Sequence, residues 1–213
     1  MRRIWTTAAA VVALAGCAHA APANHVREAE TFVKAALGDD CDMDDRKDIP
    51  VNAKDQEGVS HFVYSLSWHN SWDSKGEAPQ TAELYQMFCS MGAYNLQYAF
   101  LLRDSNSGTF RLLSFARPNS HYDYTDDSDT QLKSPPRITG YGTDTTLVNA
   151  TFDAKTQTIR SHANWRGLGD AWDAGQWRFA DGAFNLVRFE IDPTYDSDDK
   201  TKTPKSYVVF SVP

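Results

Sequence analysis

The cysteine at position 17 has the most specific chemistry of any residue in this sequence. It ends the stretch Leu14-Ala15-Gly16-Cys17, which matches the lipobox that bacteria cleave and lipidate at the cysteine. A basic start, Met1-Arg2-Arg3, and an apolar run over residues 4–16 precede it, which is the pattern of an export signal. We therefore expect residues 1–16 to be a lipoprotein signal peptide and Cys17 to be the lipidated first residue of the mature chain.

A second cleavage site follows the lipobox. Ala18-His19-Ala20 is an A-x-A site, at which ordinary signal peptidase would release a free protein that begins at Ala21. The apolar run is shorter than the roughly 20 residues of a membrane-spanning helix, so no transmembrane span is expected. The lipobox predicts a lipid anchor on the periplasmic side of the envelope, and Ala18 after the cysteine, in place of aspartate, favours the outer membrane. The A-x-A site predicts a soluble periplasmic or secreted protein instead.

The other two cysteines, Cys41 and Cys89, remain in the mature chain. Thiols in an oxidising compartment are expected to pair, so the sequence predicts a disulfide between them. In the chain-entropy model, a bridge between positions so far apart stabilises the fold by roughly 4 kcal/mol. The alternative, in which Cys89 is a nucleophile, has no partner signature to support it.

The sequence contains no recognised catalytic or metal-binding pattern. There is no G-x-S-x-G, H-E-x-x-H, phosphate-binding loop or dinucleotide fingerprint, so we assign no catalytic residue and no cofactor. Residues 40–44 imitate the start of a calcium loop, but Asp45 stands where glycine belongs and Val51 where the bidentate glutamate belongs. The histidines are isolated and the other acidic clusters are typical of solvated loops, so no metal site is predicted.

The charge of the chain narrows the choice of partners. The net charge of -7 at pH 7 becomes about -9 once Arg2 and Arg3 leave with the signal peptide. A chain this acidic repels phosphate backbones, which makes nucleic acid an unsuitable partner.

Two tryptophans are the best candidates for contacts with a ligand. Trp72 and Trp172 are expected in polar loops, and exposed tryptophans stack against sugar rings or anchor protein partners. Trp68 and Trp165 end their expected strands in phase with core residues, so burial explains them. For Trp72 and Trp172, packing and binding stay open as equal alternatives.

One helix and a series of short strands are expected to position these residues. Asn24 can cap a helix that runs to about Leu37, and Gly38 supplies its end. Beyond it, apolar and polar residues alternate with period two, which is typical of strands with one buried face. The expected strands cover residues 61–68, 82–88, 94–102, 110–115, 146–152, 158–165, 176–180, 183–191 and 207–212.

Short strands joined by tight turns, such as Asp181-Gly182, predict a mostly β fold with antiparallel sheets arranged as a sandwich or barrel. Residues 17–38 would form the anchor segment and helix, and residues 39–213 the β domain. The acidic stretch 117–137, with Pro135-Pro136, is interpreted as a long loop or as a linker between two lobes, 39–117 and 138–213. Gly92-Ala93-Tyr94-Asn95-Leu96 recurs as Gly182-Ala183-Phe184-Asn185-Leu186, which fits two related lobes or convergence on a favoured hairpin sequence.

Two stretches resemble the bacterial domain-of-unknown-function family 1176. One is Cys89-Ser90-Met91-Gly92-Ala93-Tyr94-Asn95, similar to the family's C-x-x-G-A-Y-N signature; the other is Arg166-Gly167-Leu168-Gly169-Asp170, similar to its R-G-L-G-D segment. The resemblance covers about half of the chain. The resemblance implies an exported, cysteine-containing β protein, and it implies no particular activity. Family members typically have cysteine after the aspartate of the second motif, whereas this chain has Ala171, so any bridge at that position is absent here.

Three functions remain open. The leading hypothesis is a non-catalytic envelope lipoprotein that binds an envelope protein or a glycan, because an export signal and loop tryptophans occur without catalytic signatures. The second is an envelope hydrolase whose carboxylates come from separate loops, such as Asp170 and Asp173. The third is a purely structural lipoprotein without a ligand.

Overall fold

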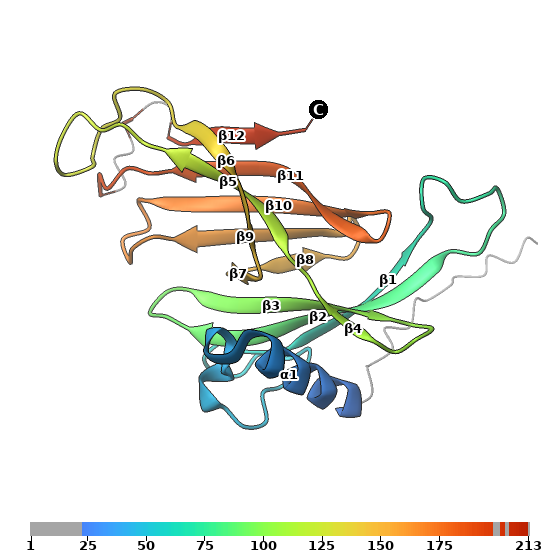
Figure 1. Ribbon diagram of the computed structural model, residues 1–213. Coiled ribbons are helices and arrows are strands. Elements are labelled where there is room, and N and C mark those ends of the chain that lie inside the picture. The colour runs from blue at the N-terminus through green and yellow to red at the C-terminus, as the bar shows by residue number, and fades with distance from the viewer. Residues whose placement is uncertain (1–22, 198–200, 203–204, 213) are drawn as a thin grey trace, which may run out of the picture.

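The computed structural model describes residues 23–197, 201–202 and 205–212 (Figure 1). The proposed signal peptide and Cys17 lie outside the described residues. Helix α1 (Ala23–Leu37) comes first, and two short 3-10 helices, η1 (Gly38–Cys41) and η2 (Met43–Asp45), follow it. Strands and their connections make up the rest. No helix in the described part of the chain is long and apolar enough to cross a membrane.

The first sheet has five antiparallel strands in the order β1-β2-β3-β4, with β7 also paired to β3. The strands β4 and β7 share one edge of β3, because β7 pairs with Gln97–Ala99 and β4 with Leu101–Arg103. The strands are β1 (Phe62–Trp68), β2 (Gln80–Met91), β3 (Leu96–Asp104), β4 (Phe110–Leu112) and β7 (Thr146–Val148).

The second sheet is also antiparallel and follows the order β12-β11-β10-β9-β8. Its central hairpin turns at Asp181-Gly182, where both residues have positive φ, as the Asp-Gly pair predicts. In Figure 1 this sheet lies above the first sheet, on the side opposite α1. Its strands are β8 (Thr151–Asp153), β9 (Thr158–Asn164), β10 (Trp172–Ala180), β11 (Ala183–Asp192) and β12 (Tyr207–Ser211).

A two-stranded arm crosses the second sheet. It consists of β5 (Phe115–His121) and β6 (Arg137–Asp144), and in Figure 1 it runs in front of β9, β10 and β11. The stretch 117–137, expected to be a loop or linker, is therefore a loop only between these two strands. Pro118 is tolerated within β5 because an isolated pair of strands leaves one edge of β5 without a hydrogen-bonded neighbour.

The helix covers the outer face of the first sheet because three of its residues share one face. Val26, Ala29 and Val33 recur at helical spacing and are all buried. Phe32 packs beside them against Phe110 of β4, with ring centroids 6.0 Å apart. The single N-terminal helix of the sequence prediction is confirmed.

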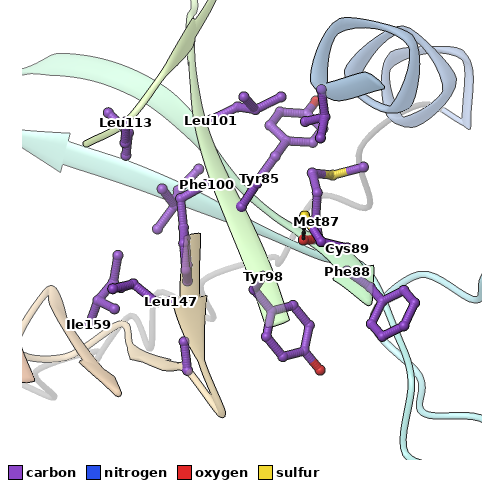
Figure 2. Close-up of a cluster of buried hydrophobic side chains, with 14 of the residues drawn as sticks. Tyr85, Met87, Phe88, Cys89, Tyr98, Phe100, Leu101, Leu113, Leu147 and Ile159 are labelled. Carbon is purple, nitrogen blue, oxygen red and sulfur yellow. Dashed lines mark hydrogen bonds between the residues drawn. The ribbon is translucent and has the colours of Figure 1, made fainter. Parts of the chain in front are cut away.

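The strands β2 and β3 are buried on both faces, and they form the centre of the molecule. Figure 2 shows Tyr85, Met87 and Leu101 pointing toward the helix, while Phe100 points toward Leu147 and Ile159 on the opposite side. The expected alternation in β3 holds for Tyr98, Phe100 and Leu102, which are all buried. The other face is buried as well because α1 covers it.

The fold class is mostly β with antiparallel sheets and one helix, as predicted. The two stretches expected as lobes contribute to one continuous hydrophobic core, which runs from α1 to β11. The repeated pentapeptide adopts two different conformations. Tyr94 lies exposed in the β2–β3 connection, whereas Phe184 lies inside β11 with its ring 5.0 Å from that of Phe179.

Candidate functional site

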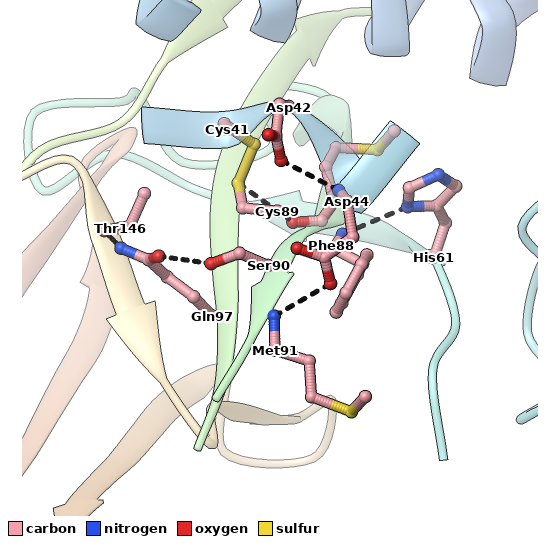
Figure 3. Close-up of a disulfide and its surroundings, with 11 residues drawn as sticks. Cys41, Asp42, Asp44, His61, Phe88, Cys89, Ser90, Met91, Gln97 and Thr146 are labelled. Atoms are coloured by element: carbon pink, nitrogen blue, oxygen red, sulfur yellow. Dashed lines mark hydrogen bonds between the residues drawn. A yellow bond between two sulfur atoms is a disulfide. The ribbon is translucent and has the colours of Figure 1, made fainter. Parts of the chain in front are cut away.

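A disulfide joins the segment after α1 to the first sheet. Cys41 at the end of η1 is bonded to Cys89 near the end of β2, and both residues are fully buried (Figure 3). The pairing predicted from the sequence is therefore present in the structure. It closes a loop with a sequence separation of 48 residues.

In the acidic stretch beside the disulfide, two aspartate side chains accept hydrogen bonds from backbone amides. Met43, Asp44 and Asp45 all have positive φ, a left-handed turn that non-glycine residues rarely adopt. Asp44 accepts a hydrogen bond from the Met91 amide at 3.1 Å, and Asp42 accepts one from the Asp44 amide at 2.8 Å (Figure 3). No group of three or more acidic, histidine or cysteine side chains in the described residues could hold a metal ion.

The first motif stretch forms the tight connection between β2 and β3. The Gly92 amide donates to the Asn95 carbonyl at 2.8 Å, which closes the turn. The side chain of Asn95 then reaches the second sheet, where it donates to the Asn164 carbonyl at 2.8 Å and accepts from the Asn164 amide at 3.3 Å. Asn95 therefore ties the two sheets together at this end.

The second motif stretch is a turn between β9 and β10 that is built on a buried ion pair. Arg166 donates to both oxygens of Asp170, with a distance of 2.8 Å for the Nε bond, and the side chain of Asp170 is fully buried. Asp170 also accepts hydrogen bonds from the backbone amides of Ser197, at 2.8 Å, and of Ala171, at 3.0 Å. The hydrogen bonds from Arg166 lower the pKa of Asp170 well below its usual range, and those from the amides add to this, against desolvation by burial.

The two motif stretches meet in space. Gly167 lies against the ring of Tyr94, so closely that a Cβ atom added to this glycine would sit 3.1 Å from Tyr94 Cε1. Ala93 and Leu168 are exposed beside this contact, and Gly92 and Gly169 provide the turns on either side. The resemblance thus rests on residues that join the two sheets at one end of the molecule, which we call the motif junction.

The two candidate tryptophans lie far apart. The expected loop position is wrong for Trp172, which begins β10 opposite Asn164 of β9 and packs on His162, with ring centroids 5.0 Å apart. Trp72 lies in the β1–β2 loop, 71% exposed, and the neighbouring Ser71 amide donates to Asp181 just beyond the other end of β10. Since β10 has nine residues, roughly 26 Å of strand separates its two ends, so the two indoles cannot contact one small ligand together.

The carboxylates of the hydrolase hypothesis are not a pair either. Asp170 is sealed in its ion pair, so no substrate can reach it. Asp173 lies on the inner face of β10, where it accepts a hydrogen bond from Trp165 Nε1 at 2.7 Å and another from Arg117 Nη2 at 3.0 Å. The other terminal nitrogen of Arg117 lies 3.7 Å from Asp144 of β6. Asp173 is therefore grouped with Asp144, across a single guanidinium group.

These side chains surround a cavity of about 260 Å³ between the arm and the second sheet. We call it the arm cavity. Its polar groups come from β5, β6, β7, β9 and β10, and its walls are largely aromatic and aliphatic. It is lined by Arg117, Asp144, Thr146, Leu147, Val148, Ser161, Ala163, Trp165, Asp173, Trp177 and Phe189.

Two polar groups of the arm cavity have unused hydrogen-bonding capacity. The carboxylate of Asp144 accepts no hydrogen bond from the described residues, and its one ion pair, to Arg117, is long. Burial raises the pKa of Asp144 above its ordinary value, although Arg117 opposes that shift. Ser161 is only 9% exposed, and its hydroxyl has no partner in the part of the chain that the structure describes.

Sequence reasoning did not single out Arg117, Asp144 or Ser161. Arg117 and Asp144 meet because β5 and β6 pair, a contact between distant residues that no local pattern reveals. Ser161 carried a usable signal, since it is in phase with Ile159 and Ala163 on the inward face of the predicted strand 158–165. A small polar residue at such a position points to a cavity or to a hydrogen bond.

A second hollow lies beside the end of β11, and a lysine already neutralises part of the charge of its carboxylates. Lys202 donates to Asp192 at 2.6 Å and lies 2.8 Å from Asp196, and it also donates to the Thr194 hydroxyl at 2.8 Å. Desolvation opposes the charge of Lys202, but the two carboxylates outweigh it and raise the lysine pKa. The acidic cluster at the end of β11 is thus occupied by a lysine side chain.

Comparison with known proteins places the chain in a family. The model of a family described as protein of unknown function, DUF1176, matches residues 18–209, which include both motif stretches and the arm cavity. A protein of Escherichia coli strain K12, named uncharacterized protein YpfG, is 43% identical over 51 residues, which are 24% of this chain and 15% of that protein. No solved structure matches the chain. Since the family model covers most of the sequence, the chain belongs to the DUF1176 family of proteins of unknown function.

Proposed function

We propose that this chain is an exported envelope lipoprotein that acts as a non-catalytic binding module and holds one unit of a glycan in the arm cavity. The observation that carries the proposal is the pair of unused polar groups, Asp144 and Ser161, in a cavity whose wall contains two indoles. Sugar hydroxyls donate and accept hydrogen bonds, so they would satisfy a carboxylate and a hydroxyl at once. The export signal at residues 1–16 and the lipobox at Cys17 support the location.

The size of the cavity limits the ligand. Pockets for drug-sized molecules have volumes of roughly 300–1,000 Å³, and the arm cavity lies just below that range. One six-membered sugar ring is a suitable occupant, whereas a whole oligosaccharide is too large. The ligand is therefore a single unit, free or at the end of a chain.

A second candidate function follows from the same carboxylates. Asp144 has a raised pKa, while Asp173 is held by Arg117 and Trp165, and two carboxyl groups in different environments can divide acid and base roles. An envelope hydrolase would then use Asp144 and Asp173 in place of Asp170 and Asp173. Appearance of cleaved product with wild-type protein, and its loss in Asp144→Asn, would select this function over simple binding.

Binding can be tested with sugars and cell-wall glycan fragments, followed by protein NMR. We expect the wild-type chain to bind. We expect Ser161→Val, which removes the hydroxyl and adds a methyl group to the cavity wall, to lose that binding at unchanged melting temperature. The matched controls are Trp72→Ala and Trp172→Ala, which lie outside the cavity and should bind as the wild type does. Loss of binding in either tryptophan variant, with Ser161→Val unaffected, would move the site to that tryptophan.

The proposed anchor has its own test. Mass spectrometry of the mature N-terminus should find an acylated Cys17 as the first residue. A mature chain that begins at Ala21 without lipid would show the alternative cleavage and a soluble protein.

A further inference from the structure

We propose that the arm cavity selects a sugar that carries a free, protonated amine and that Asp144 is the group that recognises this amine. The inference rests on the proposed glycan-binding function and adds the charge of the ligand. It follows from how the charged groups of the cavity share their partners.

The three charged side chains of the cavity leave one negative charge uncompensated. Arg117 faces both Asp144 and Asp173, and no other lysine or arginine lines the described walls. A single guanidinium group cannot neutralise two carboxylates. A cavity with an excess negative charge and low-dielectric walls attracts cations.

Arg117 serves Asp173 first. Its Nη2 atom donates to Asp173 at 3.0 Å, and its guanidinium carbon lies 5.9 Å from the ring centroid of Phe189, a contact that holds it over β11. Asp173 also receives the Trp165 indole bond, so it is well satisfied. The distance of 3.7 Å from Arg117 to Asp144 is too long for a hydrogen bond, so the remaining charge resides on Asp144.

The surroundings of Asp144 also limit what else the ligand can be. The Thr146 hydroxyl accepts a hydrogen bond from Gln97 at 2.6 Å, so among the described residues Ser161 carries the one hydroxyl of the cavity wall that has no protein partner. Leu147, Val148 and Ala163 make the adjoining wall apolar. A carboxylate without donors and a free hydroxyl in the wall of the same cavity match an ammonium group and a hydroxyl of one sugar ring.

The exposure and the pKa of Asp144 support this assignment. Its side chain is 40% exposed, yet burial raises its pKa, and the carboxylate of Asp173 adds to that shift while Arg117 opposes it. A protonated amine would supply both the opposite charge and hydrogen-bond donors. An acetylated amine is uncharged, so it would not supply the opposite charge.

The experiment compares D-glucosamine with D-glucose, N-acetyl-D-glucosamine and ethanolamine. Dissociation constants are measured by NMR titration of the full chain at slightly acidic pH and low ionic strength. Because hydrogen bonds to charged groups are stronger than neutral ones, we expect glucosamine to bind about tenfold more tightly than glucose. Asp144→Asn should remove this preference, whereas Asp39→Asn, which changes the same charge at an exposed position on the opposite side of the first sheet, should keep it.

Each other outcome would overturn a specific part of the proposal. Equal binding of glucose and glucosamine would overturn the inference while the sugar site stands. A preference that survives in Asp144→Asn would overturn the role of Asp144. Ethanolamine bound as tightly as glucosamine would show that the amine is recognised without the sugar, which overturns the glycan function but supports the charge preference. Absence of binding for all four compounds at millimolar concentration would overturn both.

Discussion

At the scale of single residues, the carboxylates of Asp170 and Asp144 show opposite designs. Asp170 has four hydrogen bonds and no exposure, and it fastens the second motif turn to the segment after β11. Asp144 is half-exposed and has one long ion pair. A carboxylate that stabilises the fold is satisfied by the protein, and one that binds a ligand keeps its oxygens free. Of these two, Asp170 stabilises the fold and Asp144 is suited to binding.

We expect Asp170→Asn to lower the free energy of unfolding by about 2–3 kcal/mol at neutral pH, because it breaks a buried ion pair. The pKa of Asp170 is lower in the folded than in the unfolded chain. Its contribution is therefore complete above about pH 4 and is lost as the pH falls toward the folded value. Urea unfolding at several pH values measures both effects.

The control for Asp170→Asn is Asp39→Asn, at an exposed position, which should change stability by less than about 0.5 kcal/mol. The difference in stability between wild type and Asp170→Asn should shrink as the solution becomes more acidic. A constant difference across the acidic range would show that the ionisation of Asp170 is not what the fold uses.

A steric clash explains why position 175 in β10 holds glycine, and adding a single methyl group there tests this explanation. A Cβ atom at this position of β10 would lie 2.6 Å from Cζ3 of Trp177 and closer still to Cη2. The indole cannot move away freely, because its Nε1 donates to the Ala116 carbonyl of the arm at 2.9 Å. We expect Gly175→Ala to destabilise the protein by about 2–3 kcal/mol, measured by chemical unfolding.

The matched control is Gly140→Ala in β6, where an added Cβ has no neighbour within 4 Å. This variant should be neutral or slightly stabilising, since alanine loses less backbone entropy on folding. Equal effects of the two substitutions would mean that backbone conformation, and not the indole, is what requires Gly175.

At the scale of elements, the disulfide is a covalent cross-link between the helical segment and the first sheet. It closes a loop with a sequence separation of 48 residues, for which the chain-entropy model gives a stabilisation of about 4 kcal/mol. We expect the double variant Cys41→Ala, Cys89→Ala to lose about 3–4 kcal/mol in urea unfolding. Reductant should destabilise the wild type similarly and leave the double variant unchanged; a wild type insensitive to reductant would contradict the assigned role.

The elements that could be predicted from the sequence are those with a strong local pattern. The alternation around Tyr98 and Phe100 gives β3, and the Asp181-Gly182 pair gives the β10–β11 hairpin. The arm was interpreted as a loop because β5 contains Pro118 and β6 contains two glycines, residues that weaken strands. It forms because Phe115 is anchored in the core between Phe100 and Trp177, which is a tertiary effect.

The candidate site was less predictable than the fold for the same reason. The disulfide followed from the number of cysteines and the expected oxidising compartment alone. The arm cavity depends on Arg117 and Asp144, which come together only when the arm folds over the second sheet. Of the hydrolase pair, Asp173 does face the cavity, and Asp170 does not, because a strand residue and a turn residue three positions apart need not share a face.

At the scale of the whole molecule, the position of α1 sets which end would face a membrane. Arg103 Nη2 lies 3.5 Å from His25 Nε2, so α1 begins beside the end of β3. The β1–β2 loop with Trp72 extends from this end, as Figure 1 shows. The motif junction lies at the other end of β3, about 26 Å away along its nine residues. If Cys17 is lipidated as proposed, the end at which α1 begins becomes the anchor end, and the opposite end is the motif end.

A lipid on Cys17, as proposed, would be separated from Ala23 by six residues, which span at most about 20 Å. We expect the anchor end to rest on the bilayer, with the exposed indole of Trp72 at the interface, a position that tryptophan favours. Lipids with brominated chains should then quench part of the tryptophan fluorescence of the vesicle-bound lipoprotein, and Trp72→Phe should remove that part. Trp172→Phe, at the motif end, should leave the quenched part unchanged. Quenching that depends on Trp172 instead would reverse the orientation and turn the motif junction and the arm cavity toward the membrane, where a glycan from the surrounding space could not reach them.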